Sequence, residues 1–509
     1  MGGSAGSFRC SDLAASAVWS MLGAALVIHG CSSAPRREPT ARPAPAPSAP
    51  AAIPATAPAP APAPEPAPAP RRATFTERPS VPSTEPDVRV RVAALRGPAP
   101  AVRLSHSAGS LRMQGVGLPP RPVACPVEAK PTAAGWRVTE AVGSKQSRAW
   151  DVSLRGTLEF AAPPGSPEII AFDGRDWPGD VRLVPVTDAP LAVDVVVAVP
   201  LERYLPGVLA QELYEKFAPE TYRAQAIAAR SFTVSEQAHW ARVRHYDLVA
   251  AEASQAWIGE TRNPKARQAA AATRGMLLVH DGRVVPAYYS STCGGTPASA
   301  IESLTNNPNH GIPPLMAGSV AGRACTGCAA APKRSWTDSF TNAEACERLR
   351  RWAGDQLRAR QARDAVANPV LPPEADPSLP EPAPGAPLEA MVGLRRIESI
   401  RVSGSNAAGR PVMLTVVGPA GATLELRAED FRRALNYAPA GSPVPKHRLP
   451  SSHIRAARVV GERIEFEGSG FGHGVGMCQF GAEGHAKAGR SADEILATYY
   501  PGAAVVRAY

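Results

Sequence analysis

The chain places His473 among closely spaced glycines, in the run Gly-Phe-Gly-His-Gly-Val-Gly-Met-Cys-Gln-Phe-Gly-Ala at residues 470–482. Because glycine has no side chain, such a loop lets a large ligand approach the histidine and the main-chain amides closely. A tight turn with an incidental histidine would explain the loop equally well if it stood alone. The interpretation therefore depends on what else the chain contains.

Three further segments accompany this loop. They are Val-Pro-Leu-Glu-Arg-Tyr-Leu-Pro-Gly-Val-Leu-Ala-Gln-Glu at 199–212 with Ala-Gln-Ala-Ile-Ala-Ala-Arg-Ser-Phe at 224–232, Tyr-Tyr-Ser-Ser-Thr-Cys-Gly-Gly at 288–295, and Tyr-Tyr-Pro-Gly at 499–502. In this order and at this spacing, the segments resemble the family of stage II sporulation protein D and the amidase enhancer of cell-wall lysis systems. The resemblance covers roughly residues 87–509.

The resemblance implies lytic transglycosylation of glycan strands, with Glu212 as the catalytic acid. One carboxylic acid suffices for this chemistry, because it protonates the glycosidic oxygen and its carboxylate then takes the proton from the 6-hydroxyl that closes on C1. An ordinary glycosidase needs two carboxylates. Nearby apolar residues, Leu209, Leu213 and Phe217, would raise the pKa of Glu212 by partial burial. Without the motif, Glu212 would be read as a solvated residue at a helix end, and Glu215 would compete with it.

The same resemblance implies a substrate-binding cleft around the acid. Gln225 and Arg230 would bind sugar hydroxyls or a lactyl carboxylate, although an arginine paired with a carboxylate for structural reasons is an equal alternative. The other residues expected to line the cleft lie on glycine-rich segments. They are Ser291, Gly294, Gly295, His473, Gly474 and Gln479.

Neither a metal nor another cofactor is expected. Some family members hold zinc through His and Cys residues in the segment that is here 245–255, but this segment contains no cysteine and offers only His245. Outside this segment the chain has a group of cysteines, of which Cys325 and Cys328 have the CxxC spacing of metal or redox sites. The group comprises Cys293, Cys325, Cys328 and Cys346. In an exported protein we expect disulfides instead, with Cys293 bonded to Cys325 or Cys328. No partner is assigned to Cys125 or Cys478.

The N-terminus predicts export. Residues 1–30, with Arg9 before an apolar run from Leu13 to Ile28, read as a signal peptide that would remove Cys10. The following Cys31 resembles the lipid-bearing cysteine of a lipoprotein box; an ordinary cleaved signal with a chance cysteine is the alternative. Residues 31–86 are rich in Ala and Pro and predict a semi-rigid polyproline II tether. The expected location is the cell envelope or periplasm, at the outer membrane if the envelope has two membranes.

Composition restricts the partners. The formal net charge is +10, but the excess comes from scattered Arg without a basic cluster interleaved with aromatic residues, so nucleic acid is not expected. An anionic envelope accounts for the charge as well. The expected partners are peptidoglycan glycan strands, a lipid-anchored membrane association and, for an enhancer, a cell-wall amidase.

The periodicity predicts an α+β fold, with a β-rich N-terminal region followed by a mixed helix and strand catalytic region. The expected strands are 87–92, 135–139, 150–160, 181–186, 193–199, 397–402 and 412–417. Helices are expected from 201, where Pro206 must kink or shorten the helix, from Pro219 to Val234, and after the capping box at 491–494. A Pro-rich insertion is expected near 353–390.

Three functions remain open at this stage. The first is a transglycosylase that cuts the muramic acid to glucosamine bond of strands stripped of stem peptides and leaves 1,6-anhydro ends. The second is a glycan-binding enhancer of an amidase that does not cut. The third is a structural wall-binding lipoprotein.

Overall fold

The computed structural model describes residues 77–97, 100–153, 156–186, 191–242, 244–304, 307–317, 325–365, 382, 385–439 and 445–509. The predicted signal peptide, the predicted lipidation site Cys31 and most of the Pro/Ala tract lie outside these ranges. Among the helices within them, none is both long enough and apolar enough to cross a membrane.

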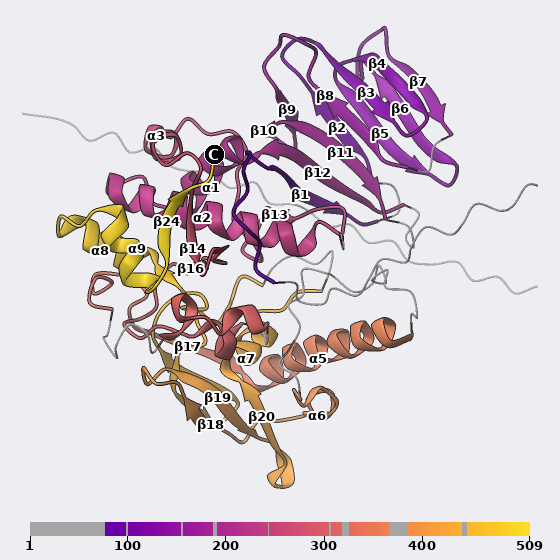
Figure 1. Cartoon of the computed structure of the whole chain (residues 1–509). Helices are drawn as coiled ribbons and strands as arrows, with labels where there is room; N and C mark the ends of the chain where they lie inside the picture. Colours follow the sequence, from indigo (N-terminus) through magenta and orange to yellow (C-terminus); the bar gives the residue numbers. More distant parts are fainter. Residues whose placement is uncertain are drawn as a thin grey trace, which may run out of the picture. The chain divides into compact units, whose positions relative to one another are not determined.

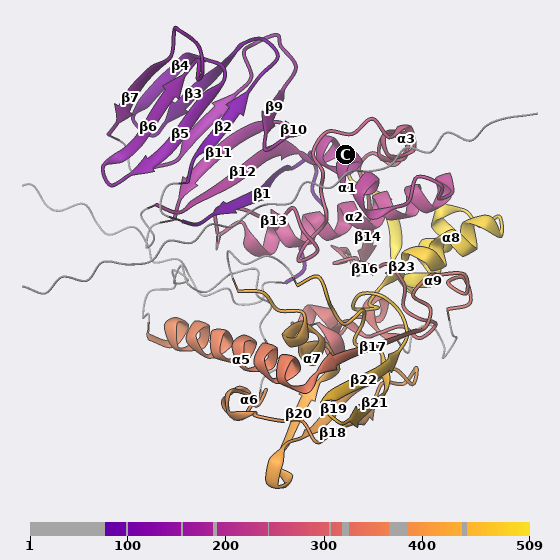
Figure 2. The same cartoon turned by 180° about the vertical axis from the view of Figure 1, so that it is seen from behind.

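The β-rich N-terminal region is confirmed and consists of two sheets, whose strands are drawn in indigo to magenta in Figure 1 and from behind in Figure 2. The seven-stranded sheet has the order β13 (Leu248–Val249), β1 (Asp87–Leu95), β12 (Val193–Pro200), β11 (Asp180–Pro185), β8 (Leu158–Ala161), β3 (Ser110–Gly115), β4 (Leu118–Ala124). The six-stranded sheet has the order β10 (Arg175–Pro178), β9 (Ile169–Phe172), β2 (Val102–Ser105), β5 (Val127–Thr132), β6 (Gly135–Glu140), β7 (Arg148–Val152). The expected strand 150–160 is thus divided between β7 and β8.

Both sheets contribute to one hydrophobic core. Val88 and Val90 of β1, Trp136 of β6 and Phe160 of β8 are all buried in it. The alternation of apolar and charged residues in β1 therefore has the predicted meaning, a strand with one face in the core. Strand β12 pairs antiparallel with β1 from Asp87↔Pro200 onward and leads directly into the first helix.

Helix α1 (Leu201–Glu212) buries its predicted apolar face, which consists of Leu201, Tyr204, Leu205, Val208 and Leu209. Pro206 lies inside this helix and does not shorten it, contrary to one of the two expected outcomes. A proline removes only one backbone donor, and the buried face of α1 compensates for that loss. The helix consequently reaches Glu212.

Helix α2 (Pro219–Trp240) starts at the predicted proline and is lined by small residues. It contacts α3 (Pro264–Ala272), α8 (Gln479–Lys487), α9 (Ala492–Tyr499) and the sheet of β15 (Arg283–Val284), β14 (Met276–His280) and β24 (Ala504–Arg507). The predicted capping box of α9 is present, with Ser491 and Glu494 bonded reciprocally. The short parallel pair β16 (Tyr289–Ser290) and β23 (Met477–Cys478) joins two of the sequence motifs.

The remaining elements form a separate core that contains Phe340, Trp352 and Phe431. Its sheets have the orders β17 (Trp336–Thr341), β22 (Arg463–Gly468), β21 (Ile454–Val460) and β18 (Ser399–Ser405), β19 (Pro411–Val417), β20 (Thr423–Arg427). Its helices are α5 (Asn342–Ala365), α6 (Leu388–Gly393) and α7 (Ala428–Leu435), and the short α4 (Ala300–Ser303) precedes them in the chain.

Two expected boundaries shift. The insertion near 353–390 begins inside α5, whose Trp352 and Ala353 are buried, so its first part is a packed helix. The tether was expected to run to residue 86, but Arg78 Nη1 donates to the His280 carbonyl at 2.9 Å and Val284 N donates to the Pro79 carbonyl at 2.9 Å. The residues from 77 onward thus belong to the folded part.

Candidate functional site

Glu212 occupies the last position of α1 and is partly exposed. Its Oε1 accepts a hydrogen bond from the Ala256 backbone N–H at 2.9 Å, and its Oε2 accepts one from Gln479 Nε2 at 3.2 Å. These donors come from the segment that follows α2 and from the first residue of α8. Three separate parts of the chain therefore meet at one carboxyl group.

Burial raises the pKa of the Glu212 carboxyl, and the negative charge of Glu252 adds to the rise. The two hydrogen bonds oppose this effect without reversing it, because donors favour the charged form. The predicted apolar neighbours Leu213 and Phe217 are buried. Glu215 is exposed, and burial thus distinguishes the two candidate acids.

The position of the Ala256 N–H depends on Gln255, which was not predicted as a site residue. Gln255 is fully buried, and its Oε1 accepts from Tyr204 Oη at 3.0 Å and from Thr233 Oγ1 at 2.8 Å. Its Nε2 donates to the Ala229 carbonyl at 3.1 Å. No periodicity or motif distinguishes a buried glutamine of this kind in a loop, and only its contacts reveal it.

The approach of this segment to α1 requires Gly207. A Cβ at this position would lie 2.2 Å from the Gly259 carbonyl oxygen and 2.5 Å from Trp257 Nε1. Real Cβ atoms do not come so close to other atoms, so glycine lets α1 contact the segment that contains Ala256.

Gln479 is held by the pairing of two predicted motifs. Strand β16 pairs in parallel with β23, with Ser290 opposite Cys478, and the Ser291 carbonyl accepts from the Phe480 N–H at 3.1 Å. The predicted residues Ser291 and Gln479 are thereby neighbours, and Gln479 reaches Glu212.

The glycines of both loops serve mainly to pack the loops together. A Cβ on Gly294 would lie 2.6 Å from Gly470 N, one on Gly295 would lie 2.5 Å from Arg334 Nη2, and one on Gly474 would lie 2.7 Å from Arg410 Nη1. The Gly294 N–H donates to Thr292 Oγ1 at 3.3 Å. The glycine spacing was predicted to admit a ligand, but at these positions it admits neighbouring protein atoms.

His473 is half-buried, and its Nδ1 accepts from the Val475 N–H at 3.0 Å. Burial lowers the pKa of His473 to about 4; Glu429 opposes this shift and the nearby Arg432, Arg433 and Arg410 reinforce it. The imidazole is consequently neutral at neutral pH. Its ring faces Tyr288, and no hydrogen bond among the described residues joins it to Glu212.

Gln225 and Arg230 lie in the core. Both are fully buried, and the amide of Gln225 has no hydrogen-bond partner within the described part of the chain. Arg230 donates from Nε and Nη2 to the two carboxylate oxygens of Glu202, each at 2.8 Å. Arg230 therefore pairs with a carboxylate for structural reasons, which was the alternative to binding the substrate.

An aromatic group that was not predicted lies beside the acid. Tyr214, 56% exposed, contacts Phe217 and Phe480 with ring centroids 5.4 and 5.7 Å apart, and those two rings are 5.3 Å apart. Phe480 follows Gln479 directly. Sugar rings commonly pack against aromatic faces, since both present apolar surface.

The segment expected to hold zinc in some relatives does not fit a metal here. His245 Nε2 lies 2.9 Å from Asp194 Oδ2, and this carboxylate also pairs with Arg91 and Arg96. Two arginines already neutralise the carboxylate. Within the described residues, the side chains that are of a metal-binding type and lie close enough together to surround an ion belong to four cysteines.

The expected cysteine group needs correction. The sulfur atoms of Cys293, Cys325, Cys328 and Cys478 all lie within 4.8 Å of one another. Cys346 is elsewhere, with its Sγ 3.5 Å from Asn342 Oδ1 in the core of the α5 region. All six described cysteines are free, so the expected Cys293 disulfide is absent. Cys478 joins the group only because β23 pairs with β16.

The fold and site define an α+β protein with a partly buried carboxylic acid held by two amide donors. Residues 191–280 match the family model described as SpoIID, stage II sporulation protein. The chain is 26% identical over 336 residues to an uncharacterised protein of Brachyspira hyodysenteriae, covering 66% of this chain and 73% of that protein. It is 26% identical over 325 residues to stage II sporulation protein D of Bacillus subtilis, covering 61% of this chain and 75% of that protein.

A further match, to the amidase enhancer of Bacillus subtilis, is 23% identical over 320 residues and covers 58% of this chain but 39% of the enhancer. The resemblance to stage II sporulation protein D and the amidase enhancer, which the motifs predicted, is thus confirmed by the family model and by these relatives.

Proposed function

We propose that this protein is a peptidoglycan lytic transglycosylase with Glu212 as its acid and base. The observation that carries the proposal is the environment of the Glu212 carboxyl. Burial raises its pKa, so that it keeps its proton to higher pH, and the Ala256 N–H and the Gln479 amide donate hydrogen bonds to its two oxygens. A group that must first give and then take a proton needs both features.

The reaction proceeds in two steps. The protonated Glu212 gives its proton to the glycosidic oxygen as the bond to C1 breaks and the leaving sugar departs as an alcohol. The carboxylate so formed is stabilised by the Ala256 and Gln479 donors. The 6-hydroxyl of muramic acid then attacks C1 and returns its proton to Glu212, so that an anhydro ring forms and no water is consumed.

The test is mass spectrometry of peptide-free glycan strands incubated with the full chain, beside Glu212→Gln. We expect anhydro-ended fragments from the native chain and at least a roughly 100-fold slower reaction from the variant, which has no proton to give. Glu215→Gln is the matched control and should cut normally.

Two other results would contradict this assignment. Fragments with reducing ends would mean hydrolysis, in which case Glu252 is the carboxylate to test as the base, because its charge acts on Glu212. No cutting by either chain, with both bound to the strands, would indicate the enhancer.

The enhancer is the second candidate, favoured by the likeness to the protein of that name. In that function the same residues would hold glycan while a separate amidase cuts. If the protein is an enhancer, Glu212→Gln should leave its stimulation of an amidase unchanged. If it is a transglycosylase, the same substitution should abolish its cleavage of glycan.

A cell-wall role, which the names of the relatives support, suits an exported protein of the cell envelope. We include the signal peptide, the lipid on Cys31 and the Pro/Ala tether in the proposal as the means of export and attachment, resting on the sequence.

A further inference from the structure

We propose that Cys293, Cys325, Cys328 and Cys478 form a structural zinc site. This inference does not rest on the proposed function, since a metal site can hold the fold whether or not Glu212 is catalytic.

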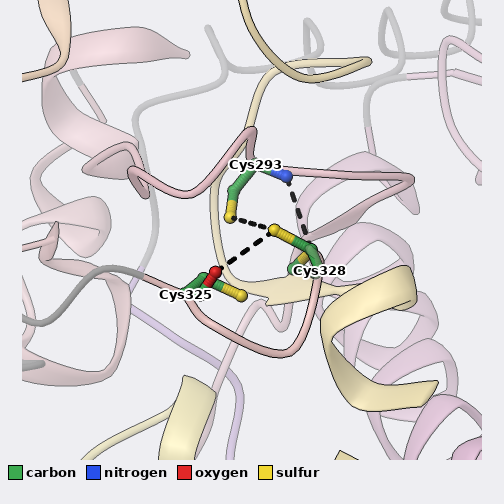
Figure 3. Close-up of side chains that lie close together, drawn as sticks. Cys293, Cys325 and Cys328 are labelled. Atoms are coloured by element: carbon green, nitrogen blue, oxygen red, sulfur yellow. Dashed lines mark hydrogen bonds between the residues drawn. The ribbon is translucent and has the colours of Figure 1, made fainter. Parts of the chain in front are cut away.

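The spacing of the sulfur atoms fits a single tetrahedral ion. Zinc binds thiolates at about 2.3 Å, which places neighbouring sulfurs of a tetrahedron about 3.8 Å apart. The Sγ atoms of Cys293 and Cys328 are 3.9 Å apart, and all four sulfurs lie within 4.8 Å of one another. Figure 3 shows the side chains of Cys293, Cys325 and Cys328 converging from two segments. An iron–sulfur cluster would need more room between its ligands.

The four ligands come from segments that the fold fixes independently. Cys293 follows β16 and Cys478 lies in the paired strand β23. The Cys325 N–H donates to the Gly295 carbonyl at 2.8 Å, which anchors the CxxC turn beside Cys293. Within that turn, a Cβ on Gly327 would lie 2.5 Å from the Gly481 carbonyl, so the turn packs directly on α8.

The surroundings suit thiolates. The N–H groups of Cys293 and Gly481 point to Cys478 Sγ at 3.4 and 3.3 Å, the second of them at the N-terminus of α8. Arg334 Nη1 lies 2.9 Å from Cys328 Sγ, and the Tyr499 hydroxyl lies 3.3 Å from Cys325 Sγ. Such donors stabilise metal-bound sulfur and offset the charge of a zinc tetrathiolate.

Three of the four cysteines are buried and Cys325 is half-buried, as in closed structural zinc sites. Binding releases the thiol protons to solvent and forms four zinc–sulfur bonds, with nothing oxidised or reduced. Zinc is favoured over iron because Zn²⁺ binds sites of this kind more strongly than Fe²⁺ does.

The site would stabilise the region next to the acid. Cys478 immediately precedes Gln479, which donates to Glu212, and it caps α8 through the Gly481 N–H. The ion would thus clamp the first turn of this helix to the loop of Cys293.

The test is elemental analysis of the full chain, purified without chelator or reductant. We expect about one zinc per chain, retained in Cys346→Ser, a buried cysteine outside the group, and in Cys125→Ser. Cys328→Ser and Cys478→Ser should lose most of it. Release of the zinc should make four more thiols reactive in the native chain and lower its melting temperature.

Because a serine variant that misfolds would also lose zinc, cobalt substitution of the native chain gives an independent reading. The intense visible bands of a tetrahedral cobalt tetrathiolate, with sulfur-to-cobalt charge transfer, are expected. Metal-free protein that lacks four thiols in denaturant would show two disulfides and overturn the proposal. Iron in place of zinc, zinc retained by Cys328→Ser, or cobalt bands without thiolate character would overturn it equally.

Discussion

Glu212 illustrates how opposing effects can be combined on a single side chain. Burial raises its pKa and hydrogen bonds from Ala256 and Gln479 lower it, with burial dominant. In the folded chain Glu212 therefore keeps its proton to a higher pH than in the unfolded chain. As pH rises from the unfolded pKa of Glu212 through its raised folded pKa, ionisation of this group reduces the stability of the fold. Glu212→Gln should remove that part of the pH dependence.

Gln479→Ala should slow glycan cleavage by roughly tenfold or more, since a hydrogen bond to a charged group is worth about 1.5–3 kcal/mol. The lost donor had lowered the pKa of Glu212, so the alkaline limb of the pH–rate profile should move to higher pH. Initial rates measured across pH would show both effects. Asp493→Ala, an exposed residue of the neighbouring helix α9, is the control. An unchanged profile would mean that Gln479 does not act on the acid.

Tyr214→Ala should weaken binding of peptide-free glycan strands about two- to tenfold, because the exposed ring offers a face for a sugar. Binding is best measured by calorimetry in the Glu212→Gln background, where cutting does not interfere. Tyr214→Phe keeps the ring and should bind as the parent does. Equal affinities for the alanine and parent proteins would place the sugar elsewhere.

At the scale of the elements, α1 and the segment 255–259 form a unit that depends on one close contact. Gly207 allows the contact, and Gln255 fixes the backbone that donates to Glu212. The helix supplies the acid and the segment supplies one of its donors. A change in their separation would alter both stability and the pKa of Glu212.

Gly207→Ala should destabilise the protein by about 1–3 kcal/mol, because the added methyl group collides with Gly259 and Trp257. Gly354→Ala is the matched control, since its Cβ would meet only Arg358 Nη1 at 3.6 Å within α5. That change should stabilise by roughly 0.5–1 kcal/mol, as alanine favours helix. Urea unfolding of both variants compares them, and equal effects would exclude the steric explanation.

At the scale of the whole molecule, Glu202 connects distant parts of the chain. Its carboxylate accepts from Arg230 of α2, from the Gly275 N–H at 3.2 Å and from the Tyr509 hydroxyl at 2.9 Å. Burial opposes its charge, but the hydrogen bonds and charge of Arg230 outweigh burial and lower the pKa of Glu202. Ionised Glu202 therefore stabilises the fold above its unfolded pKa, and this contribution is lost as pH falls through the lowered value.

Arg230→Ala should cost about 3–5 kcal/mol, since it leaves a buried carboxylate unpaired. Arg223→Ala, which breaks the more exposed pair with Glu220, should cost under about 1 kcal/mol. Chemical unfolding at neutral and acid pH should show the Arg230 deficit shrinking as Glu202 becomes protonated. A deficit that is independent of pH would mean lost packing instead of a lost ion pair.

Much of the fold could be predicted from local patterns. Alternation located β1, the Gly and Pro turns between strand candidates located β12, helical spacing located the buried face of α1, and the capping box located α9. These features depend on neighbouring residues, whose periodicity shows directly in the chain. The position of Glu212 came from a motif, and its carboxyl indeed lies in partly buried surroundings.

Only the tertiary structure decided which distant residues meet. Gln479 reaches Glu212 across 267 positions, and Cys478 joins Cys293 across 185. Cys346 was expected in the group of cysteines, whereas strand pairing brings in Cys478. Likewise, an arginine at position 230 could have bound the substrate or formed a structural ion pair in the core. Its burial beside Glu202 shows that it forms the ion pair. Local sequence determines elements because backbone and side-chain preferences act over a few residues, but a site forms where packing closes long loops, and no local pattern encodes that closure.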